Sequence, residues 1–100
     1  MHVGCCSIKF FLHGNRSLKE KRRIVRSLKD RRRNNFNVSV AEIGDQDILQ
    51  NLHMGIVAVN SDPKYLEGQT RKLVGAIEKM HLAEITDYQI RITRLDSEPS

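Results

Sequence analysis

Cysteine is scarce in this chain of 100 residues, and the two that occur, Cys5 and Cys6, are adjacent. Adjacent residues of a strand point to opposite faces, and the pair lacks the CxxC or CxxH spacing of a zinc or redox site. We therefore interpret both as packing residues and expect neither a metal site nor a cofactor. The sequence also lacks any apolar run near the roughly 18 residues that span a membrane, so we expect a soluble protein.

Tryptophan is absent, and there are only two prolines and six glycines. With an ordinary apolar share, this composition indicates a globular domain, and a chain of this length buries enough surface to fold without metal or disulfide. We expect one domain over residues 1–96 and a short polar tail over 97–100. The first residues, MHVGCCSIKFFL, lack the basic start and cleavage site of a secretory signal, which predicts a cytoplasmic protein.

Positive charge is concentrated in one segment. Ten of the 17 lysines and arginines lie between Arg16 and Arg33, where Glu20 and Asp30 are the only acids, so this segment carries +8 and the rest of the chain −3. Crowded like charges cost stability unless something offsets them. A basic segment on a mildly acidic body is therefore the pattern expected for a partner rich in phosphate or carboxylate.

The same segment carries the signals of a helix. Ser17-Leu18-Lys19-Glu20 matches a capping box, in which the Ser17 hydroxyl accepts from the Glu20 amide and Glu20 reaches back to the Ser17 amide. Asn34-Asn35 is expected to end the helix. At about 100° per residue, most basic side chains fall opposite an apolar stripe formed by Leu18, Ile24, Val25 and Leu28.

The remaining sequence predicts four strands and a second helix. Strands are expected over residues 3–12, 36–42, 53–60 and 84–95, where β-branched and aromatic residues are common or alternate with polar ones. The second helix is expected to begin with Asp62 as cap and Pro63 in its first turn, and to continue to His81. The order βαββαβ predicts an α+β ferredoxin-like fold, with a four-stranded antiparallel sheet and both helices on one face.

Such a sheet leaves its other face uncovered by helices. The residues expected on that face are too mixed to be merely solvated and too polar to be core. We interpret the face as a surface for homodimer packing or ligand contact. The residues are Ser7, Lys9, Phe11, Ser39, Ala41, Gln89 and Arg91.

Three strings in combination carry a family resemblance: SLKEKRR at residues 17–23, FNVSVAE at 36–42 and GDQD at 44–47. With them, the sequence from Met1 to about Leu95 resembles the YlxP-like family of small bacterial proteins. The resemblance implies a ferredoxin-like fold and a domain of unknown function. Genes of this family lie, in many bacteria, among genes for translation initiation and ribosome maturation factors. That implies a link to translation and assigns no catalytic residue.

The basic helix is the first candidate site. In the functional interpretation its cations contact phosphates, and each neutralised phosphate releases counterions. The alternative is a solvated helix face or a surface that packs in an oligomer. The candidate residues for nucleic-acid binding are Arg16, Lys19, Arg22, Arg23, Arg26, Lys29 and Arg33. The third predicted strand holds no aromatic residue for the base stacking that RRM domains use, so structured ribosomal RNA fits better than a single-stranded motif.

Lys21 falls in the middle of the apolar stripe of the basic helix, where a lysine needs an explanation. One interpretation is snorkelling, in which the methylenes cover the edge of the core and the ammonium reaches water. The other is an ion pair with Glu42, Asp45 or Asp47, which would tie the helix to the loop after the second strand.

The sequence holds no signature of catalysis. The spacing of the acids at residues 42–47 does not place a glycine and a terminal glutamate where a calcium loop needs them. The four histidines are dispersed, and no phosphate loop or nucleophile elbow occurs. The leading hypothesis is a non-enzymatic protein that docks its basic helix on RNA or a ribosomal subunit. The alternatives are a dimeric ligand-binding or enzymatic module with a polar pocket near residues 42–47, and an adaptor for an acidic protein.

Overall fold

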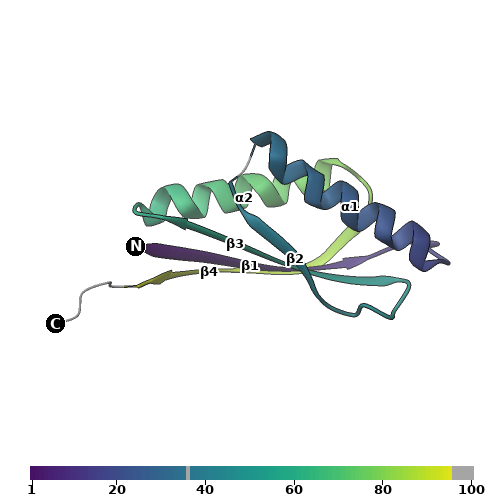
Figure 1. Ribbon diagram of the computed structural model, residues 1–100. Helices are drawn as coiled ribbons and strands as arrows, with labels where there is room; N and C mark the ends of the chain where they lie inside the picture. Colours follow the sequence, from purple (N-terminus) through teal and green to yellow (C-terminus); the bar gives the residue numbers. More distant parts are fainter. Residues whose placement is uncertain (36, 96–100) are drawn as a thin grey trace.

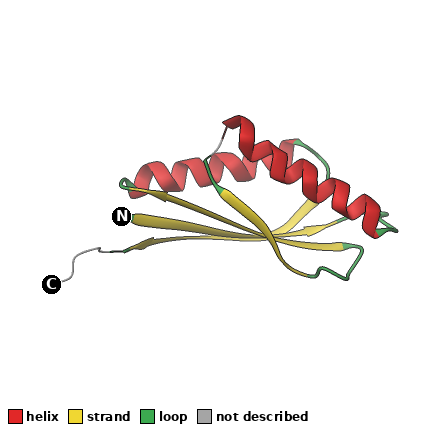
Figure 2. Cartoon of the chain, viewed as in Figure 1, coloured by secondary structure: helices red, strands yellow, loops and turns green. Residues whose placement is uncertain are grey.

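The computed structural model describes residues 1–35 and 37–95, with the backbone alone for residues 31–35. In this part of the chain the elements are β1 (His2–Phe11), α1 (Leu18–Asn35), β2 (Ser39–Gly44), β3 (Asn51–Asn60), α2 (Pro63–Lys79) and β4 (Glu84–Arg94). The strands form one antiparallel sheet in the order β2-β3-β1-β4. Both helices cover the same face of that sheet (Figure 1, Figure 2). The predicted α+β ferredoxin-like fold is confirmed.

The predicted strand boundaries are right to within two residues except at β2. The sequence predicts a strand over residues 36–42, whereas the observed strand is Ser39–Gly44. Phe36 lies outside the described residues, as does the predicted tail over 97–100. Pairing with β3 sets the observed bounds, and a bulge between Glu42 and Gly44 lets the strand continue beyond the regular register. Alternation within one strand carries no information about where its partner begins and ends.

Both helices begin at side-chain caps that the sequence predicts. Ser17 Oγ accepts from the amide of Glu20 at 3.1 Å, and Asp62 accepts from the amide of Lys64 at 2.9 Å. Each cap satisfies an amide that has no partner within its own helix. The start of α1, which carries the candidate basic site, is therefore fixed by local sequence.

The core lies between the sheet and the two helices. Alternate residues of β1 and β3 point into it, among them Ile8 and Leu52, which are both fully buried. Leu66 of α2 is also fully buried, and a Cβ built on Gly4 would lie 2.9 Å from Leu66 Cγ. At this point α2 rests directly on the backbone of β1, which is why the strand has a glycine there.

Candidate functional site

Most of the candidate basic side chains that the structure describes lie on the outer surface of α1 or just before it. Lys19, Arg22, Arg23 and Arg26 are exposed, as is Arg16 just before the helix, and Lys29 is half-buried. The side chain of Arg33 lies outside the described residues. Among the described side chains, no carboxylate lies within 4.0 Å of the charged groups of Arg16, Lys19, Arg22, Arg23, Arg26 and Lys29.

The apolar stripe opposite holds α1 on the sheet. Val25 and Leu28 are buried, and Ile24 packs against the core, as the wheel predicts. Leu18 differs, because it is 39% exposed at the first turn of the helix. The stripe fixes which side of α1 faces solvent, and so orients the cations outward.

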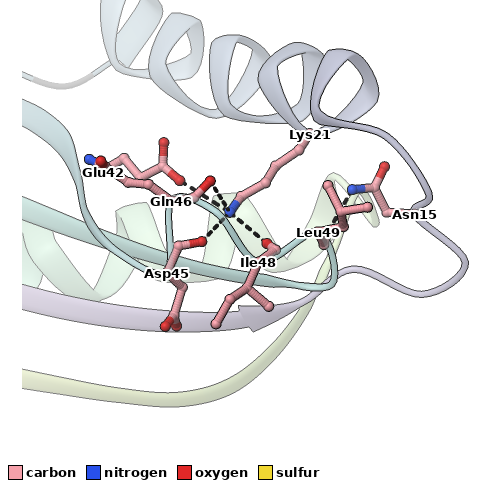
Figure 3. A network of polar contacts seen from close by, with 7 residues as sticks. All are labelled: Asn15, Lys21, Glu42, Asp45, Gln46, Ile48 and Leu49. Atoms are coloured by element: carbon pink, nitrogen blue, oxygen red, sulfur yellow. Dashed lines mark hydrogen bonds and ion pairs between the residues drawn. The ribbon is translucent and has the colours of Figure 1, made fainter.

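Lys21 is the one basic residue of the described α1 side chains that points inward, and it is 2% exposed. Its Nζ donates to the backbone carbonyl of Asp45 at 2.5 Å and to that of Ile48 at 2.8 Å, with a longer contact of 3.5 Å to Gln46 O (Figure 3). Glu42 Oε2 lies 3.3 Å from the same nitrogen. That contact lacks hydrogen-bond geometry, so we treat it as an ion pair and the carbonyls as the hydrogen-bond acceptors.

This geometry differs from snorkelling, because the ammonium is enclosed and does not reach water. Of the three acids considered from sequence, Glu42 supplies its carboxylate. Asp45 supplies a backbone carbonyl, and Asp47 makes none of the contacts recorded for Lys21 Nζ. Periodicity predicts that Lys21 points inward, but backbone acceptors from a loop 24 residues away leave no signal in the sequence.

The loop between β2 and β3 is folded around the Lys21 ammonium and is also tied to the turn before α1. Asp45 has a positive φ of 57°, which turns the chain so that successive carbonyls face the ammonium. Asn15, which is 4% exposed, donates from Nδ2 to Leu49 O at 2.5 Å, and Gln50 Nε2 donates to Asn15 O at 3.2 Å. The role of Asn15 was missed from sequence, because an asparagine after glycine is typical of an ordinary turn.

A cleft of about 510 Å³ lies between α1 and this loop. Arg22, Arg26 and Lys29 line one wall, and Glu42 and Asp47 line the other. The ligand-binding alternative expects a polar pocket at this place. The opposed charges of the two walls attract each other, so the cleft does not present a purely cationic site to an anion.

The sheet face turned away from the helices is the second candidate surface. Strand alternation and register place all seven residues predicted for this face on it: Ser7, Lys9, Phe11, Ser39, Ala41, Gln89 and Arg91. The face also carries large apolar side chains that were not predicted, with Ile43 53%, Val57 43% and Val59 59% exposed. The apolar sequence of β3 predicts a well-buried strand, but helices cover only one of its faces.

Cys5 and Cys6 point to opposite faces of β1, as adjacency predicts. Cys5 is exposed on the open face, whereas Cys6 is buried, and burial raises the pKa of the Cys6 thiol to about 11. Since the thiolate is the reactive form, we expect iodoacetamide at pH 8 to add one group per native chain in dilute solution, at Cys5, and two in urea. Peptide mass spectrometry locates the label. Two labels on the native chain would contradict the buried position of Cys6.

The described residues contain no group of three His, Cys, Asp or Glu side chains placed to hold a metal ion. Among the described residues, no helix is long and apolar enough to cross a bilayer.

Comparison with known proteins gives a family and a fold. The family described as "Protein of unknown function (DUF503)" matches residues 3–90. "Uncharacterized protein YlxP" of Bacillus subtilis (strain 168) is 33% identical over 84 residues, which cover 84% of this chain and 91% of that protein.

Solved structures resemble the chain as well. One described as "Structural Genomics, protein YJCS" has a TM-score of 0.50 at 9% identity and covers 94% of this chain and 99% of its own. The de novo designed protein Foldit4 has a TM-score of 0.48 at 15% identity and covers 96% and 100%. At such identities the first likeness shows the fold alone.

Proposed function

Since the chain belongs to the family described as protein of unknown function (DUF503), a description that assigns no activity, we propose from its own surface that it is a cytoplasmic, non-enzymatic protein that binds structured RNA through α1. The observation that carries this proposal is the row of exposed cations on α1, which form no ion pair within 4.0 Å among the described residues, although Arg22 and Arg26 also line the cleft opposite Glu42 and Asp47. A ribosomal subunit is the target we would test first, because it offers the largest surface of structured RNA in the cytoplasm.

The spacing of the cations supports contact with a chain of phosphates. Lys19, Arg22, Arg23 and Arg26 occupy two turns of one helix face. At a rise of about 1.5 Å per residue, the first and the last of these four cations lie roughly 10 Å apart along the helix axis. Their reach covers several backbone phosphates at once, and every phosphate they neutralise releases counterions to solution.

The chemistry of the groups favours phosphate over protein carboxylate. Three of the four side chains are arginines, whose planar guanidinium groups bind phosphate oxygens in a bidentate way. The open sheet face offers Phe11 as its aromatic side chain on the central strands, and Phe11 is half-buried against His13. Recognition by base stacking is therefore poorly supported, and backbone contact to folded RNA is favoured.

The buried contacts of Lys21 support the proposal by holding the basic helix in place. Its ammonium joins the first turns of α1 to the β2–β3 loop through Asp45 O and Ile48 O. A rigidly mounted helix loses less conformational freedom on binding than a flexible basic segment does.

A charge-reversal experiment tests the proposal. The variant Lys19→Glu/Arg23→Glu/Arg26→Glu is compared with Lys64→Glu/Lys72→Glu/Lys79→Glu, a control that reverses three exposed lysines on α2. Both change the formal charge from +5 to −1, so they alter non-specific attraction equally. Binding to purified ribosomal subunits and to a folded ribosomal RNA fragment is measured by co-sedimentation and fluorescence anisotropy over a salt series.

We expect the α1 variant to lose at least about tenfold in affinity and roughly two units of the log–log salt slope, because about 0.7 to 0.9 of a unit is lost per phosphate contact. The control is expected to bind nearly as the natural chain does. Equal weakening of both variants, or no binding of the natural chain to either RNA at low salt, overturns the proposal. Retention by an acidic protein alone would point to the adaptor alternative.

A further inference from the structure

We propose that the open sheet face binds a second copy of this chain, around a two-fold axis that runs across the strands at the level of Ser7. The inference is independent of RNA binding, because α1 lies on the opposite side of the sheet (Figure 1). Three observations carry it: the area of the face, its exposed apolar side chains, and charges placed symmetrically about the row of residues through Ser7.

The face is large enough for a stable dimer. The four strands comprise 37 residues. With about 3.3 Å per residue along a strand and about 4.8 Å between strands, they form a surface of roughly 600 Å². Two such faces bury about 1,200 Å² together, which is the lower end of the range for specific protein interfaces.

Burial of the exposed apolar side chains on this face would favour dimer formation through the hydrophobic effect. Ile43, Val57 and Val59 are each more than two-fifths exposed on the face, and a hollow of about 780 Å³ among Cys5, Ile43 and Val57 can accept side chains from above. A contiguous patch of this kind on an otherwise charged domain marks an interaction surface.

The middle row of the face is already covered by apolar and polar side chains. The row consists of register partners from all four strands: Ala41, Gly55, Ser7 and Gln89. Three of the four are small, and Ile43 packs over Gly55, where a Cβ would lie 3.0 Å from Ile43 Cγ2, so the row adds to the apolar surface that a second sheet would meet. Ser7 Oγ is already hydrogen-bonded to His53 Nε2 at 2.6 Å, which lowers the cost of burying both groups.

The charges on β4 make the face self-complementary. Asp87 and Arg91 lie two residues on either side of Gln89, opposite Lys9 and Cys5 of β1 respectively. A two-fold axis along the central row brings each Arg91 over the partner's Asp87, so the dimer contains this ion pair twice. Aligned sheets cross at about 30°, which shifts these positions by a few ångströms, and the long arginine side chain spans that shift. An axis parallel to the strands would instead bring β4 over β2, where Arg91 meets no acid.

A charge swap tests both the surface and the axis. Sedimentation velocity is measured over a concentration series for the natural chain, for Asp87→Arg, for Arg91→Asp and for the double variant. Glu78→Arg, an exposed change on α2 with the same charge difference as Asp87→Arg, is the control. Cys5 alkylation rates are followed in parallel, because Cys5 lies within the proposed interface and Cys6 is buried.

We expect the natural chain and the control to form dimers, each single variant to raise the dimer dissociation constant at least tenfold, and the double variant to recover most of that loss. Cys5 alkylation should slow as the concentration of the natural chain rises, and should not slow for Asp87→Arg. The proposal is overturned by a monomeric natural chain at about 200 μM, by single variants that dimerise normally, or by a double variant no better than the singles.

Discussion

Replacing Lys21 by methionine is expected to lower the free energy of unfolding by about 3 to 5 kcal/mol, the cost of removing one partner from a buried ion pair. Methionine keeps the apolar stem of the side chain and removes the ammonium. The change leaves the Glu42 carboxylate without its counter-charge and leaves the carbonyls of Asp45 and Ile48 without their donor. Domains are stable by only about 5 to 15 kcal/mol, so this single change removes a large part of the total.

Urea denaturation followed by circular dichroism measures the effect, with Lys19→Met as the control. Lys19 has the same chemistry on the exposed side of the same helix, and its replacement is expected to change stability by less than about 0.5 kcal/mol. The double change Lys21→Met/Glu42→Gln should recover part of the loss, because it removes the isolated charge while the carbonyls stay unpaired. A loss of unfolding free energy below about 1 kcal/mol for Lys21→Met would show that the ammonium does not hold the β2–β3 loop in place.

Replacing Leu66 by alanine is expected to lower the free energy of unfolding by about 2 to 5 kcal/mol. Leu66 is fully buried where α2 rests on β1, so the truncation removes apolar contacts and leaves a cavity beneath the helix. Tyr65, its neighbour in the sequence, is 57% exposed, and Tyr65→Ala serves as the control. Although it deletes more atoms, the control is expected to cost less than about 1 kcal/mol, because those atoms are largely in water.

A second change at Gly4 sharpens the Leu66 experiment. In the natural chain a Cβ at Gly4 would lie 2.9 Å from Leu66 Cγ and 3.3 Å from Ile92 Cδ1, so Gly4→Ala should cost about 1 to 3 kcal/mol by overpacking. In the Leu66→Ala background the Cγ is gone, and the same change should cost clearly less. Thermal and urea unfolding of the four chains give the coupling between the two sites. Additive losses would mean that α2 does not rest on β1 at this point.

Much of the fold is determined by short-range sequence signals. Ser17 and Asp62 set the helix starts through hydrogen bonds to amides two or three residues ahead. The alternation of β1 and β4 sets which side chains face the helices, and the βαββαβ order fixes the layer arrangement. Each signal depends on neighbours within one turn or one strand, and so can be recognised without knowing the partner elements.

The β2 boundary shows where such signals stop. The alternation of apolar and polar residues predicts a strand over residues 36–42, whereas the observed strand ends at Gly44. Pairing with β3 and the bulge at the end of that pairing set where the strand begins and ends. The burial of β3 has the same cause. Its apolar residues predict two covered faces, whereas the packing of both helices on one side leaves Val57 and Val59 exposed.

The sequence by itself determined the fold class, the outward row of cations on α1 and the inward direction of Lys21, because these follow from composition and periodicity within single elements. Only the tertiary structure decided what Lys21 meets, since its acceptors are backbone carbonyls of a loop that every residue type possesses. The equal spacing of Asp87 and Arg91 about Gln89 is visible in the sequence, but only the tertiary structure decided that Gln89 lies opposite Ser7, because strand register is a property of paired strands. The order of side chains along the sequence does not encode contacts to backbone carbonyls, and it does not encode which residues of two paired strands lie opposite each other.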